Sequence, residues 1–123
     1  MSPGDLIAIS VQHRDGVVVL AVEGEIDIAT APVLDAAVAD ALAEKPAALV
    51  IDLSGVTFLA SAGVRILVQT AEQLSGRACF AVVASGAATT RPIQLMRLDS
   101  MFALHETLDA ALAVVSTDTD NRG

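Results

Sequence analysis

The serine in the segment Leu59-Ala60-Ser61-Ala62-Gly63 is the side chain of this chain best placed for regulated chemistry. A short apolar run and a loop precede it, and apolar residues at helical spacing follow it. The first N–H groups of an α-helix have no intrahelical partner and lie at the positive end of the helix dipole. A hydroxyl at this position can therefore cap the helix, and it can equally carry a phosphate.

Patterns that would support catalysis are weak elsewhere in the chain. His13 and His105 lie far apart and near the ends of predicted elements, and no Cys/His cluster has zinc spacing. The segment from Gly55 to Gly63 lacks the Gly-Lys-Ser/Thr of a phosphate-binding loop. The residues before Ser61 lack the first glycine of a hydrolase nucleophile elbow. We therefore predict no enzyme activity, no metal and no cofactor. A small serine hydrolase that uses Ser61, with His105 left open as its base, is the least favoured alternative.

The composition is that of one acidic domain with a hydrophobic core. The chain has 123 residues, 54% of them hydrophobic, and a net charge of −8, with nine acidic and two basic residues among the first 59. Such a charge repels nucleic acid and anionic membranes and attracts a basic protein surface. Cys79 is the only cysteine and is predicted to lie in a core strand. The chain shows no signal-peptide pattern and no run long enough for a bilayer, so we expect a cytoplasmic location.

Five apolar stretches have the length and composition of strands. Asp15-Gly16 separates the first two, and Asp-Gly between apolar runs is typical of a β-hairpin. The second stretch is continuously apolar, which is typical of a central strand covered on both faces. The carboxylate-rich residues 23–27 are predicted to form a turn. The strands are predicted over 6–12, 17–23, 48–53, 78–83 and 101–104.

Four further stretches have apolar residues at helical spacing. Thr30 is the predicted N-cap of the first helix, and Pro46 marks its end. Gly76 suits the C-terminus of the second helix, and Pro92 suits the first turn of the third. Thr107 is the predicted N-cap of the fourth. The helices are predicted over 30–45, 61–75, 92–98 and 107–115.

These elements predict an α/β fold with the order β-β-α-β-α-β-α-β-α. Short β-α-β units imply parallel strands with right-handed crossovers, and the opening hairpin makes the sheet mixed but mostly parallel. The prediction is a single domain over residues 1–115 with about four helices. Residues 116–123 are predicted to form a polar, frayed tail.

The order of elements and four segments resemble the STAS domain family, and within it the bacterial anti-sigma factor antagonists. The resemblance covers residues 6–115, almost the whole chain. Its segments are Gly24-Glu25-Ile26-Asp27, Val50-Ile51-Asp52-Leu53-Ser54, Phe58-Leu59-Ala60-Ser61-Ala62-Gly63 and the stretch from Phe102 to Leu112.

What this resemblance implies is a phosphorylation switch. An antagonist of this family binds an anti-sigma factor of the GHKL type that is also a serine kinase, and a sigma factor is thereby released. The kinase then phosphorylates the serine at the start of the second helix, which matches Ser61, and a phosphatase resets the protein. Family members usually carry Asp before this serine and Ser after it, whereas this chain has Ala60 and Ala62.

The predicted partner surface surrounds Ser61 at the carboxyl ends of two adjacent parallel strands. Asp27 is expected to cap a helix, to meet a basic partner, or both, and Phe58 and Leu59 to be either buried or apolar anchors. The alternatives for the whole chain are a STAS scaffold and a nucleotide-sensing module of a larger assembly, and the sequence leaves open a homodimer. The predicted surface consists of Glu25, Asp27, Phe58, Leu59, Ala60, Ala62, Gly63 and Val64 around the phosphoacceptor Ser61.

Overall fold

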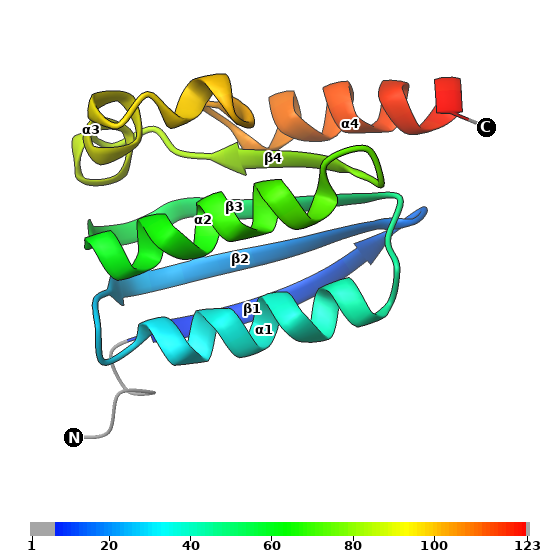
Figure 1. Cartoon of the computed structure of the whole chain (residues 1–123). Coiled ribbons are helices and arrows are strands. Elements are labelled where there is room, and N and C mark those ends of the chain that lie inside the picture. The colour runs from blue at the N-terminus through cyan, green and yellow to red at the C-terminus, as the bar shows by residue number, and fades with distance from the viewer. Residues whose placement is uncertain (1–6, 123) are drawn as a thin grey trace.

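The computed structural model describes residues 7–122, with the backbone alone described over 116–122. Its strands are β1 (Ile7–Arg14), β2 (Val17–Ile26), β3 (Ala48–Leu59), β4 (Cys79–Val83) and β5 (Ala103–His105). Its helices are α1 (Ala31–Ala43), α2 (Ser61–Leu74), α3 (Ala87–Leu95) and α4 (Leu108–Arg122), with a 3-10 turn, η2 (Leu98–Ser100). Figure 1 shows α1 and α2 running across one face of the sheet in the same direction.

The sheet is mixed and mostly parallel, as the sequence predicts. Its strand order is β1-β2-β3-β4-β5, with β1 antiparallel to β2 and every other neighbouring pair parallel. The predicted hairpin joins the first two strands. Asp15 and Gly16 adopt φ angles of 51° and 84° at its turn, a left-handed conformation that glycine favours and aspartate tolerates.

The two faces of the sheet carry two separate groups of buried side chains. On one face, alternate residues such as Leu20 of β2 and Ile51 of β3 pack against α1 and α2. On the other face, Val19 and Val50 pack against Ala111 of α4. Because β2 and β3 are covered on both sides, both faces of these strands must be apolar, which explains their continuous hydrophobic runs.

Strands β2 and β3 both extend further than predicted, which is a correction. Residues 23–26 belong to β2 rather than to a turn, and β3 continues to Leu59 where a loop was expected after residue 53. Two irregularities in the β2–β3 register each place an extra residue in β3, and such bulges break the alternation that marks a strand in a sequence. At the first of them, the Ser54 N–H donates to Asp52 Oδ1 at 2.9 Å.

The last third of the chain also departs from the predicted bounds. Helix α3 begins at Ala87, so Pro92 lies inside it instead of in its first turn. Strand β5 covers Ala103–His105, so it begins two residues and ends one residue later than expected. Helix α4 continues to Arg122, so the backbone is helical over most of the stretch predicted as a frayed tail. A domain boundary at residue 115 stays a prediction.

Helix α2 approaches the sheet very closely at Gly63. A Cβ atom on this residue would lie 2.5 Å from Ile26 Cγ2 and 2.6 Å from Leu59 Cδ1, both shorter than any normal contact. Gly63 is buried in the first turn of α2. The absence of a side chain at residue 63 therefore allows the start of α2 to pack directly on the ends of β2 and β3.

We predict that Gly63→Ala destabilises the protein although alanine favours helix formation. Overpacking costs about 1–3 kcal/mol, and two contacts this short fall in its upper half, about 2–3 kcal/mol. The gain in helix propensity is about 1 kcal/mol, so we expect a net loss of about 1–2 kcal/mol. Urea unfolding measures the free energy of unfolding. Gly86→Ala is the control, since a Cβ there meets open space. Equal stability of Gly63→Ala and the parent protein would contradict close packing at this position.

Candidate functional site

The carboxyl ends of β2 and β3 bring the acidic segment and the serine segment to one edge of the sheet. Glu25 pairs in register with Phe58, and Ile26 pairs with Leu59. Directly after this pair, the Ala60 N–H donates to the Ile26 carbonyl oxygen at 2.8 Å. Both α1 and α2 begin at this edge, on the left in Figure 1. The predicted juxtaposition of the two segments is confirmed.

Ser61 is the first residue of α2 and its side chain is exposed. The N-cap position belongs to Ala60, which has an extended backbone and no side-chain acceptor. Among the described residues, no hydrogen bond involves the Ser61 hydroxyl, so the interpretation of this serine as a helix cap is wrong. Helix α2 thus begins with an exposed hydroxyl and without a side-chain cap for its first N–H groups.

Asp27 and Thr30 lock the turn between β2 and α1 through reciprocal hydrogen bonds. Asp27 Oδ1 accepts the N–H groups of Ala29 and Thr30 at 2.9 and 3.0 Å. Thr30 Oγ1 accepts the Asp27 N–H at 2.9 Å and donates to the Glu25 carbonyl oxygen at 2.8 Å. Thr30 is the predicted N-cap of α1, but its hydroxyl bonds backward to the end of β2 instead of forward into the helix. Asp27 orders the turn before α1, but the N–H groups that it accepts precede the helix, so no side chain caps α1.

These hydrogen bonds also change the acidity of Asp27. The Thr30 N–H is the largest cause of a pKa below the ordinary value of 3.8, and the Ala29 N–H adds to it. Both donors stabilise the ionised carboxylate and are lost when the turn unfolds. The carboxylate is therefore charged at neutral pH and turned toward the backbone that it holds.

Two apolar side chains are exposed at this edge. Phe58 is 49% exposed, and Ile28, in the turn after Asp27, is 85% exposed. The predicted partner surface did not include Ile28. The one sign in the sequence that its side chain is exposed is its position in a turn, between Asp27 and Ala29. A shallow cleft of about 350 Å³ runs from Ile28 past Ala62 to Arg65 on the first turns of α1 and α2. Arg65 lies one helical turn after Ser61, so the two residues share a face of α2.

Three residues predicted to contact a partner are instead buried. Leu59 and Val64 are 6% and 3% exposed and belong to the core under α2, and Gly63 is buried where α2 meets the sheet. Their inclusion in the exposed surface is corrected, because the extended β3 turns Leu59 inward. Ala60 and Ala62 are half-buried. The edge surface is formed by the half-buried Asp27 and the exposed Glu25, Ile28, Phe58, Ser61 and Arg65.

No histidine or carboxylate hydrogen-bonds to the Ser61 hydroxyl within the part of the chain that the structure describes. His105 ends β5, and β4 lies between β5 and β3. Two strand spacings amount to about 9.6 Å, beyond hydrogen-bond reach for a serine that follows β3. Among the residues whose side chains the structure describes, 7–115, no cluster of three or more His, Cys, Asp or Glu could hold a metal ion.

Comparison with known proteins identifies the family. The model of the STAS domain matches residues 8–111. The chain belongs to the STAS domain family. Its STAS domain is 48% identical to the anti-sigma-F factor antagonist RsfB of Mycobacterium tuberculosis, over 94% of each chain. A solved structure of an anti-sigma factor antagonist from Mycobacterium paratuberculosis is 50% identical, with a TM-score of 0.88 over 94% of this chain and 99% of that one.

The STAS fold also matches a distant relative. The phosphorylated form of the Bacillus cell fate determinant SpoIIAA is 18% identical, with a TM-score of 0.65 over 88% of this chain and 99% of that one. This likeness shows a shared fold. Within residues 7–122 of this STAS protein, no helix has both the length and the apolar character needed to cross a membrane.

The lowered pKa of Asp27 predicts a pH-dependent contribution to stability. A carboxyl with a lower pKa in the folded state stabilises the fold above its unfolded pKa and loses this effect as pH falls through the folded value. We therefore expect Asp27→Asn to melt at a lower temperature than the parent protein at pH 7, and the difference to shrink as the pH falls below 3.8. Calorimetry from pH 7 to pH 2 measures it. A difference that stays constant across this range would show that charge has no part in the turn.

Proposed function

We propose that this protein is an anti-sigma factor antagonist switched by phosphorylation of Ser61. In its unmodified form it binds an anti-sigma factor serine kinase of the GHKL type, and the sigma factor held by that kinase is released. Phosphorylation of Ser61 weakens the complex, and a phosphatase restores binding. The observation that carries this proposal is the exposed, uncommitted hydroxyl of Ser61 at the uncapped start of α2. The 48% identity to a protein named as an anti-sigma-F factor antagonist supports it.

The edge surface has the chemistry that this proposal requires. Phe58 and Ile28 offer exposed apolar area close to Ser61, and aromatic side chains are frequent anchors of protein interfaces. Glu25 is exposed and pairs in register with Phe58, so a basic partner would meet a negative charge beside an apolar anchor. Asp27 contributes mainly by holding the turn that presents Ile28.

A phosphate on Ser61 would change this surface without disturbing the core. It adds a charge of about −1.5 to −2, which the helix dipole and the free N–H groups of α2 can accommodate. With Ala60 at the N-cap, no side-chain oxygen competes for these N–H groups. Arg65, one turn along the same face, can also approach the phosphate. In a complex, the same phosphate would have to be desolvated against the partner, which weakens binding.

Our test of the switch is phosphate transfer followed by binding. The protein is mixed with GHKL-type kinases encoded in the same genome and with ATP, and modified peptides are mapped by mass spectrometry. We expect phosphate on Ser61 and a roughly hundredfold loss of affinity, equivalent to about 2.8 kcal/mol. Ser61→Ala is expected to stay bound in the presence of ATP.

The controls are Ser54→Ala and Thr57→Ala, which remove the exposed hydroxyls of β3, the strand that precedes Ser61. Both should be phosphorylated and released like the parent protein. Unchanged phosphorylation of Ser61→Ala would reject Ser61 as the acceptor. Equal affinity of the kinase for the phosphorylated and unmodified proteins would reject the switch.

The apolar anchor is tested separately from the phosphate. Phe58→Ala is expected to weaken kinase binding about 30-fold, the size of an interface hot spot of about 2 kcal/mol. Val11→Ala is the matched control, because Val11 is also 49% exposed but lies on β1, outside the edge surface. Calorimetric titration gives both affinities. If the two variants bind equally well, Phe58 is not part of the interface.

A further inference from the structure

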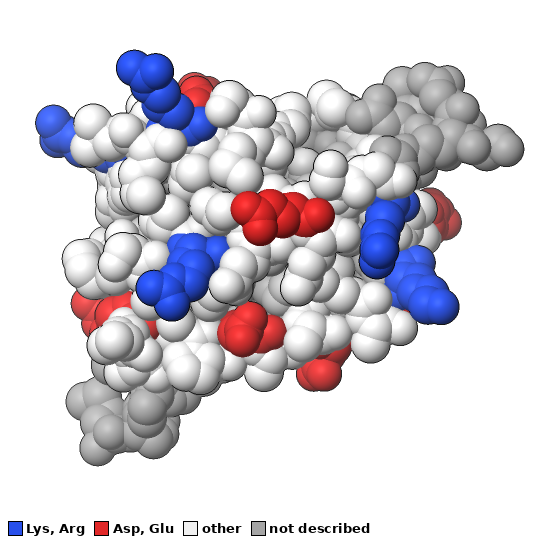
Figure 2. All heavy atoms as spheres, in the orientation of Figure 1, with Lys and Arg blue, Asp and Glu red and all other residues white. Residues whose placement is uncertain are grey.

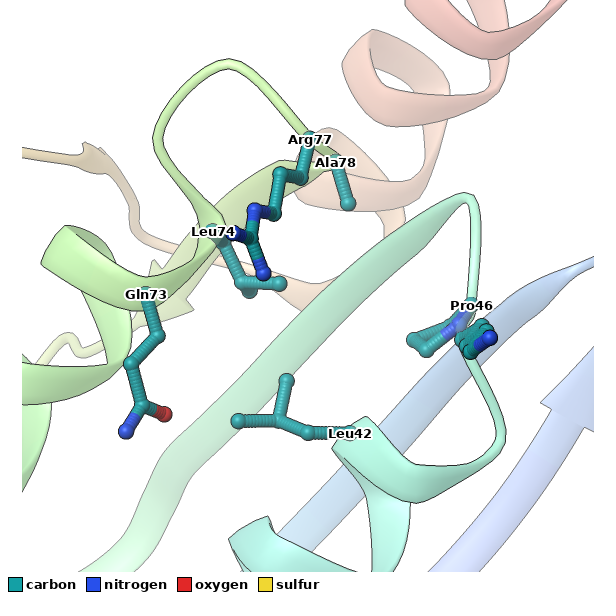
Figure 3. Close-up of a pocket in the computed structure, with 7 residues that line it drawn as sticks. Leu42, Pro46, Gln73, Leu74, Arg77 and Ala78 are labelled. Atoms are coloured by element: carbon teal, nitrogen blue, oxygen red, sulfur yellow. The ribbon is translucent and has the colours of Figure 1, made fainter.

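A second concave site lies at the opposite end of α1 and α2 from Ser61. The cleft has a volume of about 550 Å³, within the range of about 300–1,000 Å³ that is usual for small-molecule sites. Its apolar walls are Leu42 of α1 with Pro46 from the loop after it, and Leu74 of α2 with Ala78, which directly precedes β4. Figure 3 shows Leu42, Leu74 and Pro46 around a common space. The 14-residue helix α2 spans about 21 Å, so this cleft is remote from the edge surface.

The polar groups of this cleft are positive or neutral. Lys45, the only lysine of the chain, and Arg77 both line it, together with the amide of Gln73. The Arg77 guanidinium extends over Leu74 toward the space that Gln73 borders (Figure 3). Lys and Arg side chains lie at both ends of the face shown in Figure 2, with Asp and Glu side chains between them. Two cations thus line one cleft in a chain whose net charge is −8.

Neither cation has an acidic partner among the described residues. The acid next to Lys45 in sequence is Glu44, and its Oε1 lies 2.8 Å from His13 Nε2 on β1. That contact joins the end of α1 to strand β1. A guanidinium and an ammonium left unpaired beside apolar walls are typical of a site that receives an anion.

The C-terminal ends of α1 and α2 do not need the charges of Lys45 and Arg77. Backbone groups already bond to the last carbonyl oxygens of both helices: the Lys45 N–H donates to Leu42 at 3.0 Å, and the Arg77 N–H donates to Leu74 at 2.9 Å. Both residues also lie beyond the last helical turn, where the interaction of a cation with the helix dipole falls off. The charged ends of Lys45 and Arg77 are therefore available to a ligand.

We propose that this cleft binds a small organic anion with an apolar body. The carboxylate or phosphate head would lie between Lys45 and Arg77 and accept hydrogen bonds from both, with the Gln73 amide as a further donor. The apolar body would cover Leu42, Leu74 and Pro46. Neither the anionic head nor the apolar body alone would bind tightly. A bare ion would leave the apolar walls uncovered, and a hydrocarbon would leave the two cations without a partner. This site is independent of the edge surface and of Ser61.

Four probes separate the chemistry of the ligand. Octanoate and octyl phosphate carry the two anionic heads on the same chain, 1-octanol lacks the charge, and inorganic phosphate lacks the apolar body. Each is titrated into the ¹⁵N-labelled full chain and followed by NMR. We expect one or both of the amphiphilic anions to shift the backbone amides of Leu42, Leu74 and Ala78 and the side-chain amide of Gln73. We expect octanol and phosphate to bind at least about tenfold more weakly.

The variant pair Lys45→Gln/Arg77→Gln tests whether the cations hold the head group. We expect it to weaken binding of the anionic amphiphile about tenfold or more. The matched control is Arg91→Gln/Arg97→Gln, which changes the net charge by the same amount at exposed residues outside the cleft and outside the edge surface. It should bind as the parent protein does, and the NMR spectra show that both variants fold. The proposal is overturned if octanol binds as tightly as the anions, if the shifts map outside the cleft, or if both double variants bind equally.

Discussion

The contact between the first turn of α2 and the ends of β2 and β3 determines the geometry of the rest of this edge. Gly63 lies where a Cβ atom would overlap Ile26 and Leu59. The start of α2 therefore packs closer to the sheet than it could with any other residue at this position. The hydrogen bond from Ala60 to Ile26 joins the same three elements through the backbone. Because these contacts hold the start of α2 in place, Ser61 is presented on rigid elements and not on a loop.

The two turns at this edge achieve order by different means. Between β2 and α1, Asp27 and Thr30 satisfy one another's backbone, and the carboxylate is kept charged by the N–H groups that it accepts. Between β3 and α2, Ala60 supplies no such oxygen, and the positive end of the helix is left unmet by the protein's own side chains. The Asp27–Thr30 turn supplies its own hydrogen-bond partners. At the start of α2, a bound anion would supply the acceptor that the first N–H groups lack.

The sequence was sufficient to predict the order of elements, the hairpin and the mixed sheet, since these follow from apolar periodicity and turn residues such as Asp15-Gly16. It was not sufficient for the length of β3, because two bulges interrupt the alternation on which strand prediction depends. That one difference explains why Leu59, for which the sequence leaves both burial and a partner contact open, is buried. Ile28 was missed for a related reason: its exposure depends on the Asp27–Thr30 contacts, which turn the side chain away from the core.

Strand β1 leaves one edge of the sheet open. Over the described residues it pairs only with β2, in a register without a bulge, and none of its eight residues is lysine or proline. Those are the usual steric and chemical guards of an exposed edge. The net charge of −8 protects this edge instead, because it makes copies of the chain repel one another. In colloidal terms the protein is protected by electrostatic repulsion, and at 1 M salt the screening length falls to about 3 Å, shorter than the spacing of paired strands.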